Sequence, residues 1–217
     1  MLLGPPGVGK GTQGRMLAQA FGVPQIGTGD IFRHAVKEHT PMGSAAKSYM
    51  DAGKLVPDDV TIGLVEERLN QPDAQNGFVL DGFPRTAAQA TALDALMHGK
   101  GKHLDGVIEI KVDPSEVLRR LTGRRLCAVC QTLYHLESAP TRQAGVCDRC
   151  AGALIQRPDD DKATVLARLD EYQRKTAPLT EYYGGSGLLR VVDGNGDVNS
   201  VLNRIMTALQ APVAPTA

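Results

Sequence analysis

The stretch Gly4-Pro5-Pro6-Gly7-Val8-Gly9-Lys10-Gly11-Thr12 determines the fold class of this chain. Gly4 and Gly9 enclose four residues and Lys10 follows directly, which is the spacing of a phosphate-binding loop between a strand and a helix. Glycines let successive backbone N–H groups turn toward one anion, and a helix that begins near Lys10 directs its positive end to the same point. The lysine side chain then reaches the outer phosphates as a mobile charge. The stretch therefore predicts a nucleotide site.

One position in this stretch departs from the strict pattern. Ser or Thr normally follows the lysine, whereas here Gly11 does and Thr12 comes one position later. A glycine-rich turn without a ligand is the alternative interpretation. The flanking residues favour the nucleotide site, because Leu2-Leu3 precede the loop as a short strand and apolar side chains recur at helical spacing over residues 16–21.

Outward from this loop, short apolar runs alternate with longer amphipathic stretches. Strands are expected at Met1–Leu3, Pro24–Gly27, Gly77–Leu80, Gly106–Val112 and Leu188–Val192. Helices are expected at Lys10–Ala20, Gly29–Glu38, Met42–Ala52, Asp58–Leu69, Thr86–Met97, Pro114–Thr122, Asp160–Tyr183 and Val198–Leu209. This alternation predicts an α/β fold with a parallel sheet covered on both faces and ligands at the carboxyl ends of its strands. Ala211–Ala217 are expected to form a frayed tail.

Length and charge restrict the class of protein. The chain has 217 residues, which suits one domain or a core with small insertions. Lys plus Arg and Asp plus Glu both count 24, so no net charge points to a nucleic acid or a membrane surface. Aromatic residues make up 4% and Trp is absent, which argues against a binder that stacks on bases. No apolar run is long enough to span a bilayer. The four cysteines lie in one short window, unlike a disulfide framework spread through a small secreted chain, so we expect a cytosolic protein.

Polar residues follow two of the expected strands. Gly27–Asp30 follow the second strand with Arg33 one helical turn later, and a helix cap with a solvated arginine is the simpler explanation. Asp81 ends the third strand beside the phosphate loop, where a carboxylate suits a Mg²⁺ site, although an ordinary turn explains it almost as well. Arg85 follows with Gln89 at helical distance. Together, Arg33 and Arg85 predict a second anion opposite the first.

Four further arginines cluster around the cysteine-bearing segment: Arg120, Arg124, Arg157 and Arg168. The four-residue separation of Arg120 and Arg124 predicts that they share one helix face. Phosphoryl transfer requires donors directed at the phosphoryl oxygens and exclusion of water, and arginine supplies planar, permanently charged donors. Surface ion pairs with Asp159–Asp161 are the alternative for any one of them.

The four cysteines form two C-x₂-C pairs, Cys127 with Cys130 and Cys147 with Cys150. Each pair can occupy one edge of a tetrahedron, and four thiolates suit Zn²⁺. Two disulfides or reduced core cysteines are the alternative. The run Leu126–Gln156 is rich in turn formers and poor in large apolar residues, so we expect metal binding to supply much of its folding free energy.

These motifs together resemble the adenylate kinase family, in its long bacterial form with a four-cysteine zinc lid. The resemblance runs nearly end to end and rests on the loop at 4–12, Thr-Gly-Asp at 28–30, Asp-Gly-Phe-Pro-Arg-Thr at 81–86, Gly-Arg-Arg at 123–125 and the cysteines. The family's loop carries the same Gly before Thr, so Gly11 is expected. The paired Asp159-Asp160 after Arg157 also matches the family's lid hinge.

The resemblance implies an enzyme that transfers a phosphoryl group reversibly and in line from Mg·ATP to AMP, giving two ADP. It implies a nucleoside monophosphate kinase fold with a five-stranded parallel sheet and three parts: a core (residues 1–27, 57–123 and 161–217), a helical AMP flap (28–56) and a zinc-ribbon-like lid (124–160). It further implies a cytoplasmic monomer with Mg²⁺ and a structural Zn²⁺, and without nucleic acid or membrane partners.

The resemblance also assigns roles to residues. ATP is expected to contact Gly7, Val8, Gly9, Lys10, Gly11, Thr12, Arg120, Arg124 and Tyr134. AMP is expected to contact Thr28, Arg33, Lys54, Leu55, Val56, Gly82, Arg85, Gln89, Arg157 and Arg168. Lys10, Arg85, Arg124, Arg157 and Arg168 are expected to act in catalysis, and Asp81 to hold Mg²⁺ through water. Lid closure is expected to exclude water, because water at the γ-phosphate would make the enzyme an ATPase.

The family's first strand normally has several apolar residues before the loop, whereas only Met1–Leu3 precede it here. We expect the natural start to lie upstream, and two or three restored apolar residues to raise thermal stability.

Three other functions remain open at this point. A zinc-ribbon nucleic-acid binder would use the same cysteines, but the segment between the two pairs has Arg142 as its only Lys or Arg. A P-loop switch or hydrolase would share Lys10 but does not explain Arg33, Arg85 and Gln89. A kinase for another nucleoside monophosphate is closer, since only Thr28 and Gln89 bear on the acceptor base.

Overall fold

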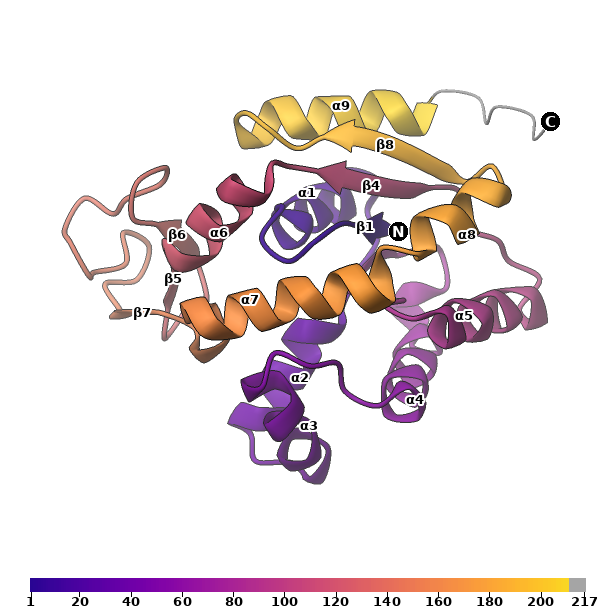
Figure 1. Cartoon of the computed structure of the whole chain (residues 1–217), viewed down its shortest axis with the longest axis horizontal. Helices are drawn as coiled ribbons and strands as arrows, with labels where there is room; N and C mark the ends of the chain where they lie inside the picture. Colours follow the sequence, from indigo (N-terminus) through magenta and orange to yellow (C-terminus); the bar gives the residue numbers. More distant parts are fainter. Residues whose placement is uncertain (211–217) are drawn as a thin grey trace.

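The computed structural model describes residues 1–210, so the expected tail Ala211–Ala217 lies outside the described residues. At its centre is a parallel sheet with the strand order β2-β3-β1-β4-β8 (Figure 1). The strands are β1 (Leu2–Leu3), β2 (Gln25–Gly27), β3 (Val79–Asp81), β4 (Val107–Lys111) and β8 (Leu189–Asp193). This confirms the predicted five-stranded parallel sheet and places the carboxyl ends of β1, β2 and β3 at one edge.

Helices cover both faces of this sheet (Figure 1). They are α1 (Lys10–Phe21), α2 (Thr28–Lys37), α3 (Pro41–Asp51), α4 (Asp58–Leu69), α5 (Ala87–Gly99), α6 (Pro114–Thr122), α7 (Lys162–Glu171), α8 (Leu179–Gly185) and α9 (Val198–Gln210). Because successive strand residues point to opposite faces, Leu2 packs against α1, α6 and α9 while Leu3 packs against α4, α5 and α8. Two apolar clusters therefore sandwich the sheet and fix the loop that follows β1.

The long helix expected over Asp160–Tyr183 is divided in the structure, which corrects that prediction. Asp160 ends a short 3₁₀ turn (Pro158–Asp160), and the Asp161 carboxylate caps α7 by accepting from Ala163 N at 3.0 Å. After α7, a wider π turn spans Tyr172–Thr176 before α8 begins. Pro178 has no N–H to continue the ladder, so the helix is interrupted where it passes the cleft.

A second, antiparallel sheet with the order β6-β5-β7 carries the cysteines. It consists of β5 (Arg124–Cys127), β6 (Leu133–His135) and β7 (Leu154–Ile155), which were not predicted as strands. Strands of two to four residues in a turn-rich run give too little alternation to recognise. Among residues 1–210, none between 124 and 160 belongs to an apolar core cluster, so this sheet has little hydrophobic support.

Helices α2 and α3 form a pair below the sheet (Figure 1). Their buried core consists of Phe32, Ala46 and Val56, separate from the clusters on the sheet. The two helices cross closely, because a Cβ at Gly43 would lie 2.1 Å from the Ala35 carbonyl oxygen. A third short helix-like turn, η1 (Pro72–Ala74), precedes β3.

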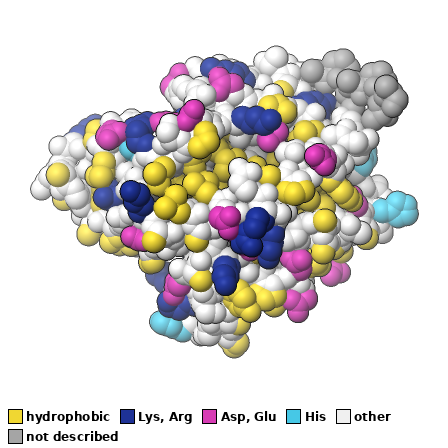
Figure 2. Space-filling model, viewed as in Figure 1, with side chains coloured by type: hydrophobic (Ala, Val, Ile, Leu, Met, Phe, Trp, Pro, Cys, Tyr) yellow, Lys and Arg dark blue, Asp and Glu magenta, His cyan; other side chains and the backbone are white. Residues whose placement is uncertain are grey.

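Basic and acidic side chains are interspersed on the face seen in Figure 2 rather than gathered by sign. This agrees with the formal net charge of zero. None of the helices among the described residues has the length and apolar character needed to cross a membrane.

Candidate active site

One cleft of about 1010 Å³ opens at the carboxyl edge of the sheet. It is lined by residues from the loop after β1, from α2, from the loops after α3 and β3, and from the cysteine-bearing sheet. Every residue predicted to bind ATP or AMP lies on its wall. Residues more than 150 positions apart in the chain thus meet around a single space.

The loop after β1 encloses the Lys10 ammonium. Lys10 Nζ donates to the carbonyl oxygens of Gly4 at 2.6 Å and Pro5 at 2.8 Å, so the side chain lies back over its own loop. Gly7 has φ +88°, and a Cβ there would lie 2.7 Å from the Leu121 side chain, which explains the glycine. Burial lowers the pKa of Lys10 to about 7 despite the nearby Asp81 carboxylate.

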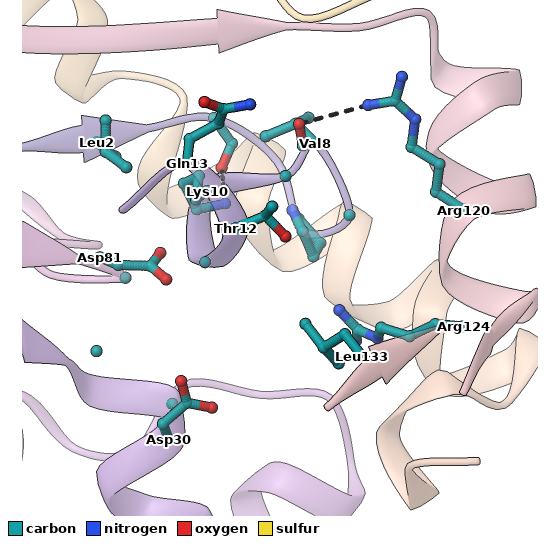
Figure 3. A pocket seen from close by; sticks show the side chains of 18 of the residues that line it. Leu2, Val8, Lys10, Thr12, Gln13, Asp30, Asp81, Arg120, Arg124 and Leu133 are labelled. Carbon is teal, nitrogen blue, oxygen red and sulfur yellow. Dashed lines mark hydrogen bonds between the residues drawn. The ribbon is translucent and has the colours of Figure 1, made fainter. Parts of the chain in front are cut away.

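Gly11 also has a structural reason. A Cβ at this position would lie 3.3 Å from an Asp81 carboxylate oxygen, and any longer side chain would fill the space between α1 and β3. Gln25 Nε2 donates to the same Asp81 oxygen at 3.3 Å. In Figure 3 the Asp81 carboxylate faces the cleft near Lys10 and Thr12. The departure from the strict loop pattern therefore keeps Asp81 open to the cleft.

The loop after β3 builds the opposite wall of the cleft. Gly82 O accepts from Arg85 Nε at 2.8 Å and from Thr28 Oγ1 at 2.7 Å, which links this loop to α2. The Gln89 amide is fixed at both ends, since its Oε1 accepts from Arg85 N at 2.7 Å and its Nε2 donates to Asp58 at 2.7 Å. These contacts orient Arg85 and Gln89 rigidly beside α2.

A cluster of arginines lies between the two walls. Arg124 makes a two-pronged pair with the fully buried Asp160, at 2.8 and 2.5 Å. Arg168 pairs with Asp159 at 3.0 Å, and Arg33 approaches the same carboxylate at 3.8 Å. Figure 3 shows Arg124 extending from β5 toward the cleft.

The electrostatics of this cluster favour an anion. Burial, and then the neighbouring Arg168, lower the pKa of Arg85 to about 10. Burial, and then Arg33, lower the pKa of Arg157 to about 10 as well. Burial alone would raise the pKa of Asp159, but Arg168 and Arg33 bring it below its ordinary value. Crowded cations that are costly to hold together would be stabilised by a phosphate placed among them.

The predicted sharing of a helix face by Arg120 and Arg124 is wrong. Helix α6 ends at Thr122 with Gly123 as its C-cap, so Arg124 already begins β5. Arg120 stays on α6, where Glu116 holds its Nε at 2.7 Å, and its other nitrogens donate to Val8 O at 3.4 Å and Gly194 O at 3.2 Å. The two arginines therefore enter the cleft from different elements, Arg120 from α6 and Arg124 from β5.

The four cysteines converge as predicted. Their sulfurs lie within 4.8 Å of one another, with Cys127 to Cys150 at 3.4 Å and Cys130 to Cys147 at 3.5 Å. All four are free thiols. Four zinc–sulfur bonds of about 2.3 Å in a tetrahedron place the sulfurs roughly 3.8 Å apart. The sulfur separations here begin at 3.4 Å and do not exceed 4.8 Å, so they lie on both sides of that value. The donor set thus fits a closed, four-thiolate metal site.

Two hydroxyls of the β6 segment support these sulfurs. Thr132 Oγ1 lies 3.1 Å from Cys130 Sγ, and Tyr134 Oη lies 3.3 Å from Cys147 Sγ. Leu133, between them in sequence, is one of the residues drawn on the cleft wall in Figure 3. The segment therefore connects the cysteine cluster to the cleft, and the Tyr134 hydroxyl, predicted only as an ATP contact, also contacts a metal-ligand candidate.

Comparison with known proteins agrees with this geometry. The family model described as adenylate kinase matches residues 2–188. The chain belongs to the adenylate kinase family. The adenylate kinase of Citrifermentans bemidjiense is 58% identical over 97% of this chain and 99% of its own length. The adenylate kinases of Moorella thermoacetica and Bacillus velezensis are 53% and 51% identical, each over 96% of both chains.

The predicted family, its fold and the class of enzyme, an ATP:AMP phosphotransferase, are therefore confirmed. A nucleic-acid binder and a P-loop hydrolase are not favoured for an adenylate kinase. Adenylate kinases use Mg²⁺ with ATP, and ATP, AMP and ADP are the substrates of the family.

The contacts of several cleft residues carried no signal in the sequence, although Asp30 itself lies in the Thr-Gly-Asp motif. Asp30 approaches Arg157 at 3.8 Å across the cleft, and Glu116 holds Arg120. Both are acidic residues on helices, which resemble solvated surface residues until their arginine partners are known. Gln13 is buried against the start of α9, although an amide on an amphipathic helix is ordinarily exposed. Only the fold, which brings distant segments together, identifies the partners of these three.

Proposed function

We propose that this adenylate kinase moves the γ-phosphoryl group of ATP directly to AMP, with both nucleotides in the one cleft. The observation that carries the proposal is the arrangement of two anion-binding walls, one built on Lys10 and one on Arg85, with arginines between them. Such an arrangement aligns donor and acceptor for in-line transfer, which needs positioning and electrostatic stabilisation rather than covalent help.

The donor side consists of the loop Gly7–Thr12 and Lys10, with Arg120 against the base and Arg124 and Tyr134 nearer the lid. Lys10 stabilises charge as it shifts among the phosphoryl oxygens. Asp81 faces this side and would hold Mg²⁺ through water. When bound with ATP, that ion neutralises phosphate charge and fixes the phosphate geometry.

The acceptor side consists of Thr28, Arg33, Lys54, Leu55, Val56, Gly82, Arg85 and Gln89, all on the cleft wall. The hydrogen bonds of Gly82 to Thr28 and Arg85 support this assignment, because they pre-organise the α2 side of the wall. Arg124, Arg157 and Arg168 would contact the transferring group from between the two sides.

Residues 28–56 and 124–160 would move as an AMP flap and a lid about a core of residues 1–27, 57–123 and 161–217. The pairing of Arg33 in the flap with Asp159 in the lid supports this division, since the two segments meet across the cleft. Closure excludes water from the γ-phosphate, which keeps transfer to AMP ahead of hydrolysis.

The four cysteines would bind Zn²⁺ in a structural role. The metal would brace β5 and β6, so that Arg124 at the base of the lid moves with it as one body. We further propose a cytoplasmic monomer that binds neither nucleic acid nor membrane. Its four free thiols and its balanced charge support this assignment.

Coupled assays with Mg·ATP and AMP, UMP, CMP or GMP as acceptor test the proposed function. AMP is expected to be preferred, because Gln89 and Thr28 are positioned beside the acceptor base. Equal rates with UMP or CMP would instead support a less selective nucleoside monophosphate kinase. ATP loss at the same rate without any acceptor would indicate a hydrolase.

Replacing Arg85 with Ala is expected to raise the KM for AMP and lower turnover, by about tenfold or more in each, while ATP affinity changes little. The reason is that Arg85 lies on the acceptor wall, beside Gly82 and Thr28. Steady-state kinetics with each substrate varied would measure this. Arg68→Ala is the control, because Arg68 pairs with the exposed Asp73 and neither residue lines the cleft. An effect confined to the affinity for ATP would contradict the assignment and place Arg85 on the donor side.

ATP binding is expected to take up a proton above neutral pH. Lys10 has a pKa of about 7 in the free protein, so it is mostly neutral near pH 8. Phosphates beside it raise the pKa, and the complex therefore binds roughly one proton more than the free protein. Titration calorimetry of Mg·ATP in buffers of different ionisation heat would measure the uptake. It is expected to vanish in Lys10→Met, and uptake persisting there would assign the proton to another group.

A further inference from the structure

Thr176 is a buried residue that the proposed mechanism does not use. It ends the π turn Tyr172–Thr176, lies on the cleft wall and is 7% exposed. Its Oγ1 lies 2.9 Å from the carbonyl oxygen of Arg85, which is 91 positions away in the chain. A carbonyl can only accept, so the Thr176 hydroxyl donates its proton to Arg85. This contact joins the segment between α7 and α8 to the loop that carries an arginine of the acceptor side.

The π turn leaves the Thr176 hydroxyl available for this contact. In a regular helix a threonine hydroxyl commonly bonds back to a carbonyl of its own preceding turn, as Thr180 does to Ala177 O at 2.8 Å. Here Ala177 N donates to Tyr172 O at 2.9 Å, five residues back rather than four, so the turn accommodates one extra residue. The hydroxyl of Thr176 is therefore directed at another element, and π turns of this kind are frequent at functional sites.

The backbone of Arg85 is held on both sides by side chains of other elements. Arg85 N donates to Gln89 Oε1 at 2.7 Å, and Arg85 O accepts from Thr176. Gln89 belongs to α5 and Thr176 to the π turn, so the two contacts fix the residue between separate elements. The guanidinium extends from this fixed backbone, and its Nε donates to Gly82 O at 2.8 Å. Loss of either backbone contact would let the guanidinium move.

Arg85 needs this support because a like charge lies nearby. Burial, and then Arg168, lower the pKa of Arg85 to about 10. Arg168 lies on α7, the helix that runs past the sheet and leads into the π turn (Figure 1). Repulsion tends to separate the two guanidiniums, whereas the Thr176 contact ties the backbone of Arg85 to the segment that follows Arg168. The contact thus helps to set the spacing of two cations that line the same cleft.

We propose that Thr176 is a positioning residue for phosphoryl transfer, whose hydroxyl holds the Arg85 backbone so that the guanidinium is directed at the phosphate of AMP. This inference rests on the proposed place of Arg85 on the acceptor side. A displaced guanidinium would meet the phosphate poorly in the bound state and in the transfer step, so both AMP binding and turnover depend on the contact. The loop that would hold ATP is supported separately, through Leu2 and Leu3.

The test measures the steady-state kinetics of Thr176→Val, which keeps the shape of the side chain and removes its hydroxyl. The kcat/KM for AMP is expected to fall about fivefold, the effect of one neutral hydrogen bond, while the KM for ATP stays unchanged. Thr176→Ser keeps the hydroxyl and is expected to recover most of this loss. Thr180→Val is the matched control and is expected to behave as the wild type, because Thr180 does not line the cleft and its hydroxyl bonds within its own segment.

A double-mutant cycle with Arg85→Ala separates positioning from a general structural role. If Thr176 acts through the Arg85 guanidinium, Thr176→Val changes the kcat/KM for AMP by less than about twofold once that guanidinium is absent. The same fivefold loss in the Arg85→Ala background would overturn the inference, because the hydroxyl would then act on AMP or on the fold directly. A lower melting temperature with unchanged AMP kinetics would also overturn it and leave Thr176 as a structural contact.

Thr176→Ala repeats the cycle where Thr176→Val does not fold. Absence of AMP-dependent transfer in the wild type would contradict the proposed function instead. Equilibrium binding of AMP to the wild type, the two single variants and the double variant would then decide the inference by the same comparison.

Discussion

Replacing Lys10 with Met is expected to lower turnover by roughly a thousandfold or more while the fold survives. The ammonium lies within the phosphate-binding loop, and its charge matters most as negative charge shifts onto the oxygens of the transferring group. Its removal therefore lowers kcat as well as kcat/KM. The loop itself is held by the sheet clusters through Leu2 and Leu3, which the substitution does not touch.

Steady-state kinetics together with a thermal melt measure this effect. Lys100→Met, at a half-buried lysine that contacts Asn70 away from the cleft, is the matched control and is expected to behave as the wild type. A Lys10 variant with near-normal turnover would remove this residue from the mechanism.

Removal of the metal is expected to lower the melting temperature and to increase proteolysis between Leu126 and Gln156, while low-temperature activity persists at a substantial fraction. A catalytic zinc keeps an open position for water, whereas four thiolates fill every position. Structural zinc contributes on the order of 10 kcal/mol to the folding of an isolated small module. Here the core clusters lie outside the lid, so only the lid loses order.

The metal-free enzyme can be made in two ways: by adding a chelator to the wild type, or by the double substitution Cys127→Ser, Cys130→Ser. Melting curves and limited proteolysis compare them, and chelation of the double variant is expected to change nothing further. A metal-free enzyme that kept its melting point but lost all turnover would show that the metal is catalytic.

Local signals account for what could be predicted from the sequence. The loop at 4–12 and the C-x₂-C pairs place their functional atoms within a few residues of one another, so spacing alone indicates the chemistry. Strand and helix periodicity likewise predicted the parallel sheet. The prediction failed where a single residue outweighed periodicity, as at Pro178. It also failed where Arg124 was placed on the face of a helix that, as predicted, ends at Thr122.

Contacts between distant segments account for the rest. Nothing near Gln13 in the sequence indicates that Val198 lies 2.9 Å from its amide. The Asp160 partner of Arg124 is 36 positions away, and the Tyr134 hydroxyl of β6 meets Cys147 from the segment that leads to β7. Pairing between such residues depends on topology, which residue patterns do not specify.

Because helices α2 and α3 have a small core of their own, changes to their packing can alter the rate of catalysis without altering the global stability of the enzyme. Phe32, Ala46 and Val56 hold that pair of helices, whereas the clusters on the sheet resist global melting. In the proposed mechanism the rate at which products escape depends on how often this pair leaves the cleft. Adaptation to a colder or hotter habitat can therefore change the turnover rate through substitutions in this small core, while the clusters on the sheet that stabilise the fold stay the same.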